Sequence, residues 1–152
     1  GGQLVISGEK AAVEKAAELA TAKGAKRAML LPVSAPFHCK LMQPAADVMA
    51  EALSNVVIKA PASPLVSNVL AAPISDPDEI RRRLVEQVTG TVRWRESIAY
   101  MAGQGVTRFF EIGAGKVLSG LVKRIADGAV GVAVGGPSDI AGAKDALAAA
   151  TA

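Results

Sequence analysis

The last third of the chain alternates short apolar runs with helical patterns, and this alternation constrains the fold more than any other feature of the sequence. Apolar residues at 109–112 and 129–134 predict strands, whereas the spacing of apolar residues over 117–126 and 140–150 predicts helices. Strands that are joined by helices pair in parallel and are covered by those helices. We therefore expect an α/β fold with a largely parallel sheet.

The earlier part of the chain carries similar patterns. Two apolar runs predict strands, at residues 3–7 and 28–33, and two shorter apolar runs, at residues 56–58 and 65–66, are separated by a turn at Pro61 and Pro64. Three amphipathic stretches predict helices, at residues 9–23, at residues 41–53, and from residue 94 to an end among Gly103 and Gly105. The clearest helix start follows Asp76, a suitable N-cap, because Pro77 suits the first helical position and Glu79 can complete a capping box.

Composition limits the possible functions. The 152 residues are 51% hydrophobic and 20% charged, which is typical of a globular domain with an aliphatic core. One cysteine and one histidine exclude a disulfide framework and a multi-histidine metal site. Aromatic residues make up only 3%, so the net charge of +3 does not indicate nucleic-acid binding. With no membrane-length apolar run and no evident signal peptide, we expect a cytoplasmic protein.

A glycine turn, Gly-Ala-Gly-Lys at residues 113–116, joins a predicted strand to a predicted helix. A phosphate loop would need a glycine in place of Phe110 and a serine or threonine in place of Val117. A dinucleotide-binding turn would need a glycine in place of Leu118. We therefore interpret the glycines as a tight turn, with nucleotide binding as a weaker alternative.

His38 lies in a proline-containing loop, Val-Ser-Ala-Pro-Phe-His-Cys at residues 33–39. Loops between strands and helices are where α/β enzymes present catalytic side chains, although a lone histidine can also be an ordinary solvated residue. Neighbouring side chains point apart, so we expect Cys39 to pack rather than to react with His38. If His38 is a base, its nucleophile must come from elsewhere.

The remaining charged residues favour ordinary structural roles. Most carboxylates fall on expected helix surfaces, whereas Glu111 lies within a predicted strand and should be partly buried, as a cap or in an ion pair. The densest basic cluster predicts a solvated surface, with docking to an acidic partner as the alternative. It consists of Arg81, Arg82, Arg83, Arg93 and Arg95.

Several segments resemble the malonyl-CoA:acyl carrier protein transacylases. Residues 33–45 resemble the segment around the active-site histidine of that family, and Gln87 with residues 92–94 resembles the stretch around a second active-site position. Residues 110–124 resemble its C-terminal signature, and residues 3–8 resemble one of its strands. The resemblance is collinear over essentially the whole chain.

The resemblance implies part of an α/β-hydrolase-like acyltransferase domain. Residues 1–34 would be the second half of a ferredoxin-like small subdomain, and residues 35–152 the C-terminal part of the large domain. The chain begins Gly1-Gly2-Gln3 without methionine, and we expect it to be part of a longer protein. Strands without their sheet neighbours expose edges, so we expect the missing half to be required for a stable fold.

The resemblance also implies an activity: transfer of malonyl from malonyl-CoA to the phosphopantetheine thiol of acyl carrier protein, in bacterial fatty acid biosynthesis. A serine of the family's G-H-S-x-G motif is acylated, and the carrier thiol then takes the malonyl group. His38 matches the general base, and the main-chain carbonyl of Gln87 would orient its imidazole. Phe37 matches a pocket residue whose bulk favours malonyl over branched acyl groups.

The chain departs from the family in what it lacks. It contains no G-H-S-x-G motif, no N-terminal G-Q-G oxyanion loop and no arginine after such a motif to bind the malonyl carboxylate. We therefore expect this chain alone to be inactive, and the parent enzyme to use malonyl-CoA without a bound cofactor or metal. The alternative is a non-catalytic module that docks an acidic carrier through basic residues. The candidate docking residues are Arg81, Lys116, Lys123 and Arg124.

Overall fold

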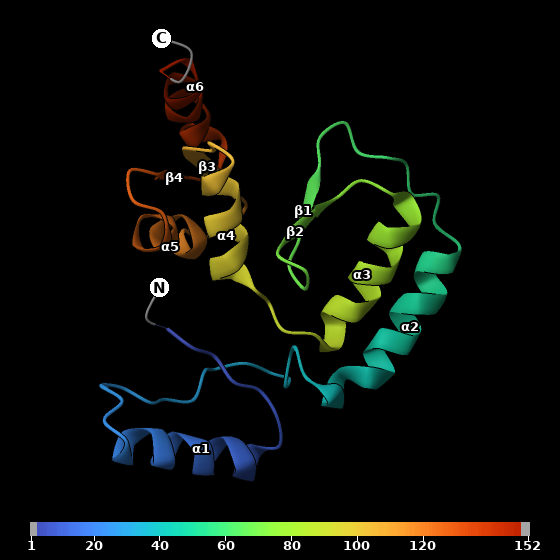
Figure 1. Cartoon of the computed structure of the whole chain (residues 1–152), viewed down its shortest axis with the longest axis vertical. Coiled ribbons are helices and arrows are strands. Elements are labelled where there is room, and N and C mark those ends of the chain that lie inside the picture. Colours follow the sequence, from blue (N-terminus) through green and yellow to red (C-terminus); the bar gives the residue numbers. More distant parts are fainter. Residues whose placement is uncertain (1–2, 150–152) are drawn as a thin grey trace. The chain divides into compact units, whose positions relative to one another are not determined.

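The computed structural model describes residues 3–149 and divides them into two compact units, residues 3–93 and residues 94–149 (Figure 1). The domain boundary expected at residue 34 falls inside the first of these units. That boundary refers to the domains of a longer enzyme, and it stays a prediction.

The first unit combines helices with one small antiparallel hairpin. Strand β1 pairs with β2, with Val66 opposite Pro73, and helix α2 packs against α3 (Figure 1). The short 3-10 turn η1 leads directly into α2, so the helix expected from residue 41 begins at Gln43. The elements in order are α1 (Lys10–Ala22), η1 (Lys40–Met42), α2 (Gln43–Ser54), β1 (Leu65–Ser67), β2 (Ala72–Ile74) and α3 (Pro77–Thr89).

Helix α3 begins where the sequence predicts. Oδ1 of Asp76 accepts a hydrogen bond of 2.7 Å from the backbone N–H of Glu79, and Pro77 occupies the first helical position. The second half of the expected capping box is wrong, because the Glu79 carboxylate turns to Arg82 and Arg83 instead. Hydrogen bonds between a carboxylate and two guanidinium groups are stronger than one to a backbone N–H, so the Glu79 carboxylate does not bind the N-cap N–H.

The second unit has the expected strand–helix–strand–helix order, preceded by one helix. Strand β3 pairs in parallel with β4, with Phe110 opposite Val132, and α5 packs on both strands. Its core is formed by Ile98, Val122 and Ala126, against which Trp94 and Phe109 pack. The elements are α4 (Trp94–Gly103), β3 (Arg108–Ile112), α5 (Val117–Ile125), β4 (Val130–Val134), η2 (Pro137–Asp139) and α6 (Ile140–Ala148).

Strand β4 passes very close to α5 at one glycine. A Cβ atom added to Gly131 would lie 2.3 Å from the carbonyl oxygen of Ser119, which is far inside van der Waals contact. Only glycine allows this approach of strand to helix backbone.

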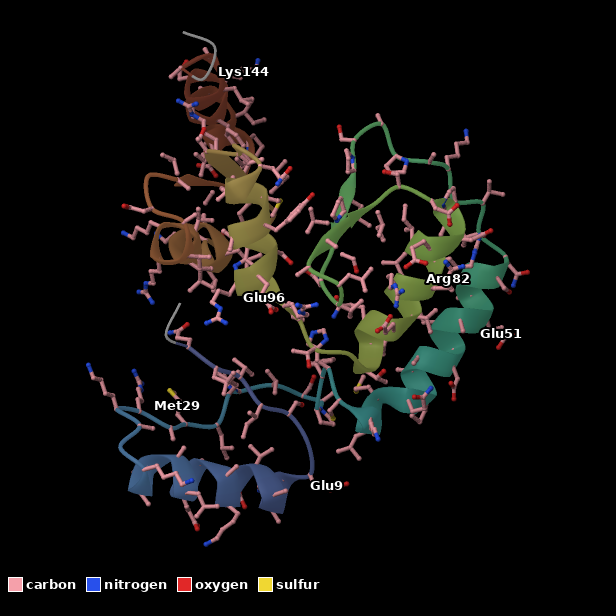
Figure 2. All side chains as sticks on the ribbon, viewed as in Figure 1. Glu9, Met29, Glu51, Arg82, Glu96 and Lys144 are labelled. Carbon is pink, nitrogen blue, oxygen red and sulfur yellow. The ribbon has the colours of Figure 1, made fainter. Side chains whose placement is uncertain are left out.

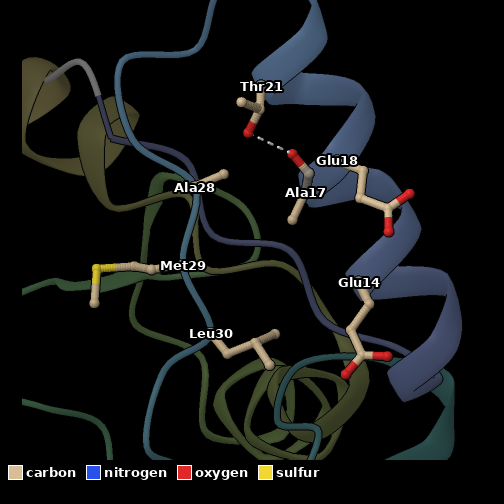
Figure 3. Close-up of a pocket in the computed structure, with 7 residues that line it drawn as sticks. All are labelled: Glu14, Ala17, Glu18, Thr21, Ala28, Met29 and Leu30. Atoms are coloured by element: carbon tan, nitrogen blue, oxygen red, sulfur yellow. Dashed lines mark hydrogen bonds between the residues drawn. The ribbon is translucent and has the colours of Figure 1, made fainter.

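Two of the predicted strands are wrong: residues 3–7 and 28–33 form no β-ladder. Their side chains are exposed. Leu4 is 90% exposed, and Met29, which is labelled in Figure 2, is 57% exposed. The side chains of Ala28 and Leu30 point toward α1 while that of Met29 points away, which is the alternation of a strand (Figure 3). Within residues 3–149 these segments have strand-like sequences but no strand beside them.

The expectation of a largely parallel sheet holds for only one of the two strand pairs. The β1–β2 pair is antiparallel, and the sequence analysis missed β2. Pro73 has no N–H to donate to a β-ladder, so its presence argues against a strand in the sequence. A proline is compatible with β2 because β2 is an edge strand. No helix among the described residues has the length and apolarity to span a bilayer.

Candidate functional site

His38 occupies a tight loop immediately before η1. Its backbone φ of +61° lies in the left-handed region, which a non-glycine residue adopts at a cost in energy. Short-range hydrogen bonds close the loop: Phe37 N–H donates to the Ala35 carbonyl at 2.9 Å, and the Cys39 thiol donates to the Pro36 carbonyl at 3.1 Å. Cys39 is half-buried, in agreement with its expected packing role.

The imidazole of His38 reaches across the first unit to the end of α3. Its Nδ1 lies 3.0 Å from the backbone carbonyl oxygen of Gln87, a residue 49 positions later in the chain. Gln87 is in the last turn of α3, where helix carbonyls lack intrahelical partners and carry the negative end of the helix dipole. The carbonyl is therefore free to accept a hydrogen bond, and it favours positive charge beside it.

The contact between Nδ1 and the Gln87 carbonyl determines which nitrogen of the His38 ring can accept a proton. When Nδ1–H donates to the Gln87 carbonyl, the lone pair of the neutral imidazole is on Nε2. The side chain is exposed, and Nε2 has no hydrogen-bond partner among residues 3–149. A histidine held through one nitrogen with the other open to a ligand has the arrangement of a general base.

Phe37, the neighbour of His38, is 47% exposed, so its ring is partly accessible to a ligand. The first unit also has a hollow between α1 and residues 28–30, with Thr21 Oγ1 donating to the Ala17 carbonyl at one side (Figure 3). The carboxylates at this hollow belong to ordinary surface ion pairs, Lys10–Glu14 and Lys15–Glu18. The hollow therefore offers no reactive group comparable to His38.

The four candidate docking residues are divided between the two units, one in the first and three in the second. Arg81 lies on α3 in the first unit, where its Nη2 donates to the Val56 carbonyl at 3.0 Å and its Nε lies 4.0 Å from Asp78. Its side chain is 27% exposed, so little of the guanidinium faces solvent. Arg82 and Arg83, on the same helix, are paired with acidic residues of α3.

Lys116, Lys123 and Arg124 are exposed residues of α5 or its N-cap in the second unit. Lys116, Ser119 and Lys123 are spaced by three and four residues, so they lie on one face of the helix. Together with Ala129 and Gly131 they line a shallow groove between α5 and β4, which we call the α5–β4 groove. No carboxylate is among its lining residues, so the groove is cationic.

Glu111 caps α5 from the neighbouring strand. Its Oε2 accepts a 2.8 Å hydrogen bond from Ser119 N–H, and its Oε1 accepts one of 3.2 Å from Leu118 N–H. The Ser119 N–H lowers the pKa of the Glu111 carboxyl, and the other N–H groups of the first turn add to this effect. The capping role expected for Glu111 is confirmed, and the helix end that a nucleotide phosphate would use is already filled by a carboxylate.

We expect Glu111→Gln to destabilise the chain at neutral pH. Because the pKa of Glu111 is lowered from its ordinary value of 4.5, the ionised form contributes stability above that value and loses it as the pH falls toward the lowered pKa. The difference in melting temperature between wild type and Glu111→Gln, measured with the chain joined to the half it lacks, should therefore be largest near neutrality and shrink on acidification below that value. Glu51→Gln, at an exposed position of α2, is the control. A difference that does not change with pH would contradict the assignment.

Among the described residues, no three histidine, cysteine, aspartate or glutamate side chains are close enough together to hold a metal ion. Within residues 3–149, His38 has no carboxylate partner of the kind found in many catalytic triads; its partner is Gln87. Sequence spacing alone could not have paired residues 38 and 87, and only the resemblance pointed to this contact.

No family model matches the chain. The malonyl CoA-acyl carrier protein transacylase of Escherichia coli is 49% identical over 144 residues, which are 95% of this chain and 47% of that protein. An acyl-carrier-protein S-malonyltransferase from Bartonella henselae has a TM-score of 0.87 at 53% identity, over 93% of this chain and 45% of that one.

A further match is to a chain in the structure of a type II polyketide synthase acyl-carrier protein in complex with its malonyl-transacylase. Its TM-score is 0.84 at 43% identity, over 90% of this chain and 44% of that chain. The chain thus spans about half the length of the curated relatives it matches. Over nearly its own whole length, this chain matches the malonyl CoA-acyl carrier protein transacylases in both sequence and fold.

Proposed function

We propose that this chain supplies the histidine base of a malonyl CoA-acyl carrier protein transacylase. The observation that carries the proposal is the 3.0 Å contact between His38 Nδ1 and the Gln87 carbonyl, which leaves Nε2 open. The 152 residues contain no G-H-S-x-G motif, so the serine nucleophile belongs to a segment outside them. The similarity to transacylases over 95% of the chain supports this assignment.

In the first half-reaction, His38 Nε2 accepts the proton of the serine hydroxyl as the serine oxygen attacks the thioester carbonyl of malonyl-CoA. The carbon–sulfur bond then breaks, and the imidazolium returns the proton to the sulfur of coenzyme A. Throughout, Nδ1–H donates to the Gln87 carbonyl. The carbonyl and the negative end of α3 stabilise the imidazolium in place of a carboxylate.

In the second half-reaction, the same nitrogen accepts the proton of the phosphopantetheine thiol. The sulfur attacks the ester carbonyl of malonyl-serine, the carbon–oxygen bond breaks, and the serine oxygen recovers the proton from Nε2. The exchange consumes no redox equivalent. The exposed ring of Phe37, directly before the base, would narrow the space beside the malonyl α-carbon and disfavour branched acyl groups.

The proposal includes the setting and the partner of the reaction. We assign it to fatty acid biosynthesis in the bacterial cytoplasm, as the resemblance to the bacterial transacylases implies. The partner is an acyl carrier protein. The α5–β4 groove, with Lys116 and Lys123 and no carboxylate, suits an acidic surface better than Arg81, which is occupied within its own unit.

The direct test is a chimera in which this chain replaces the 144 residues it matches in the Escherichia coli relative, so that the remainder of that protein supplies the serine. After incubation with malonyl-CoA, the intact mass of the chimera should increase by one malonyl group. A chimera that melts cooperatively yet gains no malonyl group would overturn the proposal. A chimera that binds holo-carrier in a salt-sensitive way without being acylated would favour the docking module.

Reversing one charge in the groove should weaken docking of the carrier. We expect Lys123→Glu in the chimera to raise KM for holo-acyl carrier protein roughly three- to tenfold at low salt, because an attraction becomes a repulsion. The effect should fall as salt is added, and malonyl loading should be unchanged. Lys144→Glu, an equal charge change on α6, is the control (Figure 2). Equal effects of the two substitutions would remove the groove from the docking surface.

A further inference from the structure

Gln87 approaches His38 with its side chain as well as with its backbone. Its amide Nε2 lies 3.3 Å from Nδ1 of His38, the same ring nitrogen that lies 3.0 Å from its carbonyl oxygen. One residue therefore presents both a donor and an acceptor to one nitrogen of the imidazole. Orientation of the imidazole, the role proposed for Gln87 above, involves only its backbone carbonyl and does not account for the position of its side-chain amide.

The two contacts serve different forms of the ring. When Nδ1 carries the proton, it donates to the carbonyl oxygen. The amide nitrogen is itself a donor and cannot accept a hydrogen bond from Nδ1–H. When the proton is on Nε2, Nδ1 is an acceptor, and only the amide N–H can bind it. Each neutral tautomer of His38 thus has its own hydrogen-bond partner on Gln87.

We propose that the Gln87 side-chain amide is a positioning group that holds His38 in its Nε2–H tautomer, complementing the carbonyl, which holds the Nδ1–H tautomer. His38 is exposed and its backbone is in a costly conformation, so its ring needs such anchoring. With the amide present, the ring stays at the end of α3 whichever nitrogen carries the proton. The amide also sets how much of the neutral ring has Nε2 free to act as a base.

This inference rests on the proposed function for its catalytic meaning, but its test does not. His38 is the single histidine of the chain. In the 15N-labelled chimera, its two imidazole nitrogen signals are therefore identified as those that disappear in His38→Ala. At alkaline pH, where a histidine side chain is neutral, the two 15N shifts report the ratio of the tautomers. The measurement uses the chimera, so that the chain has the half it lacks, and it needs no substrate and no carrier.

Gln87→Met keeps the backbone carbonyl and much of the side-chain length but removes the amide. We expect it to raise the ratio of Nδ1–H to Nε2–H about two- to tenfold, the equilibrium equivalent of one neutral hydrogen bond. Gln87→Glu offers only acceptors and should shift the ratio in the same direction. Gln87→Lys offers only a donor and should keep the Nε2–H form populated. Gln104→Met, the same chemical change in the second unit, should have no effect.

A ratio that is unchanged in Gln87→Met would overturn the proposal, and so would a fall in the Nδ1–H form, which would mean that the amide oxygen faces the ring. If Gln87→Met unfolds, as judged by circular dichroism, the other two variants decide the matter: Gln87→Glu should raise the ratio of Nδ1–H to Nε2–H, and Gln87→Lys should not. Failure of the chimera to load malonyl leaves the tautomer ratio unaffected, so the two proposals fail separately.

Discussion

His38→Ala in the chimera should lower the rate of malonyl loading by about a hundredfold to ten-thousandfold, the range that a positioned general base contributes. The reason is the geometry at the end of α3. Nδ1 is committed to the Gln87 carbonyl at 3.0 Å, and Nε2 is the one imidazole nitrogen left to take the serine or thiol proton. Alanine removes that nitrogen and leaves both half-reactions without their base. Rates are measured by intact mass after rapid mixing with malonyl-CoA.

Two companion variants separate chemistry from folding. His38→Gly removes the same base and also relieves the positive φ of +61°, so it should be as inactive as His38→Ala but no less stable. Lys40→Ala, two residues away on the exposed start of η1, should load malonyl at a rate close to that of the unsubstituted chimera. Loading by His38→Ala within twofold of the unsubstituted rate would contradict the assignment of His38 as the base.

Gly131→Ala should destabilise the chain by about 1–3 kcal/mol or more, the cost of forcing extra volume into a packed contact. The new Cβ would meet Ser119 at 2.3 Å from its carbonyl oxygen and at 2.8 Å from its carbonyl carbon. Both atoms are backbone, so α5 must move away from β4 as a whole. The expected readout, measured on the chimera, is a lower urea midpoint with an unchanged m-value.

Gly142→Ala is the matched control for Gly131→Ala. Gly142 lies in α6, and a Cβ there meets no atom within 4 Å. Alanine should therefore raise helix stability by up to about 1 kcal/mol. Equal destabilisation by the two substitutions would show that the close approach of β4 to α5 does not exist in solution.

Local chemistry made the helices predictable. Asp76 and Pro77 mark the start of α3, and the Asp76 carboxylate accepts the Glu79 N–H as expected. The strand–helix–strand–helix order after residue 108 was equally clear, because apolar runs and helical spacing alternate there. In these cases the residues that determine the structure lie within a few positions of one another.

Strands were less predictable, because a strand depends on a partner that can lie anywhere in the chain. Leu4 and Met29 lie in apolar, strand-like segments, yet they form no ladder with any described residue. Conversely, β2 was not predicted because it contains Pro73, and it is formed only because β1 lies opposite it.

The functional site also depends on residues that are far apart in the sequence. The loop position of His38 singled it out, whereas its contact with Gln87 joins residues 49 positions apart, and only the family resemblance predicted it.

The central claim is that this chain carries the base for a complete malonyl exchange, and one mass measurement tests it directly. The malonyl-loaded chimera is mixed with holo-acyl carrier protein, and both intact masses are followed over time. We predict that the chimera loses one malonyl group as the carrier gains one, and that His38→Ala slows this transfer by at least about a hundredfold. A carrier that gains no malonyl group from a loaded chimera, or gains it equally fast from the His38→Ala variant, would contradict the account.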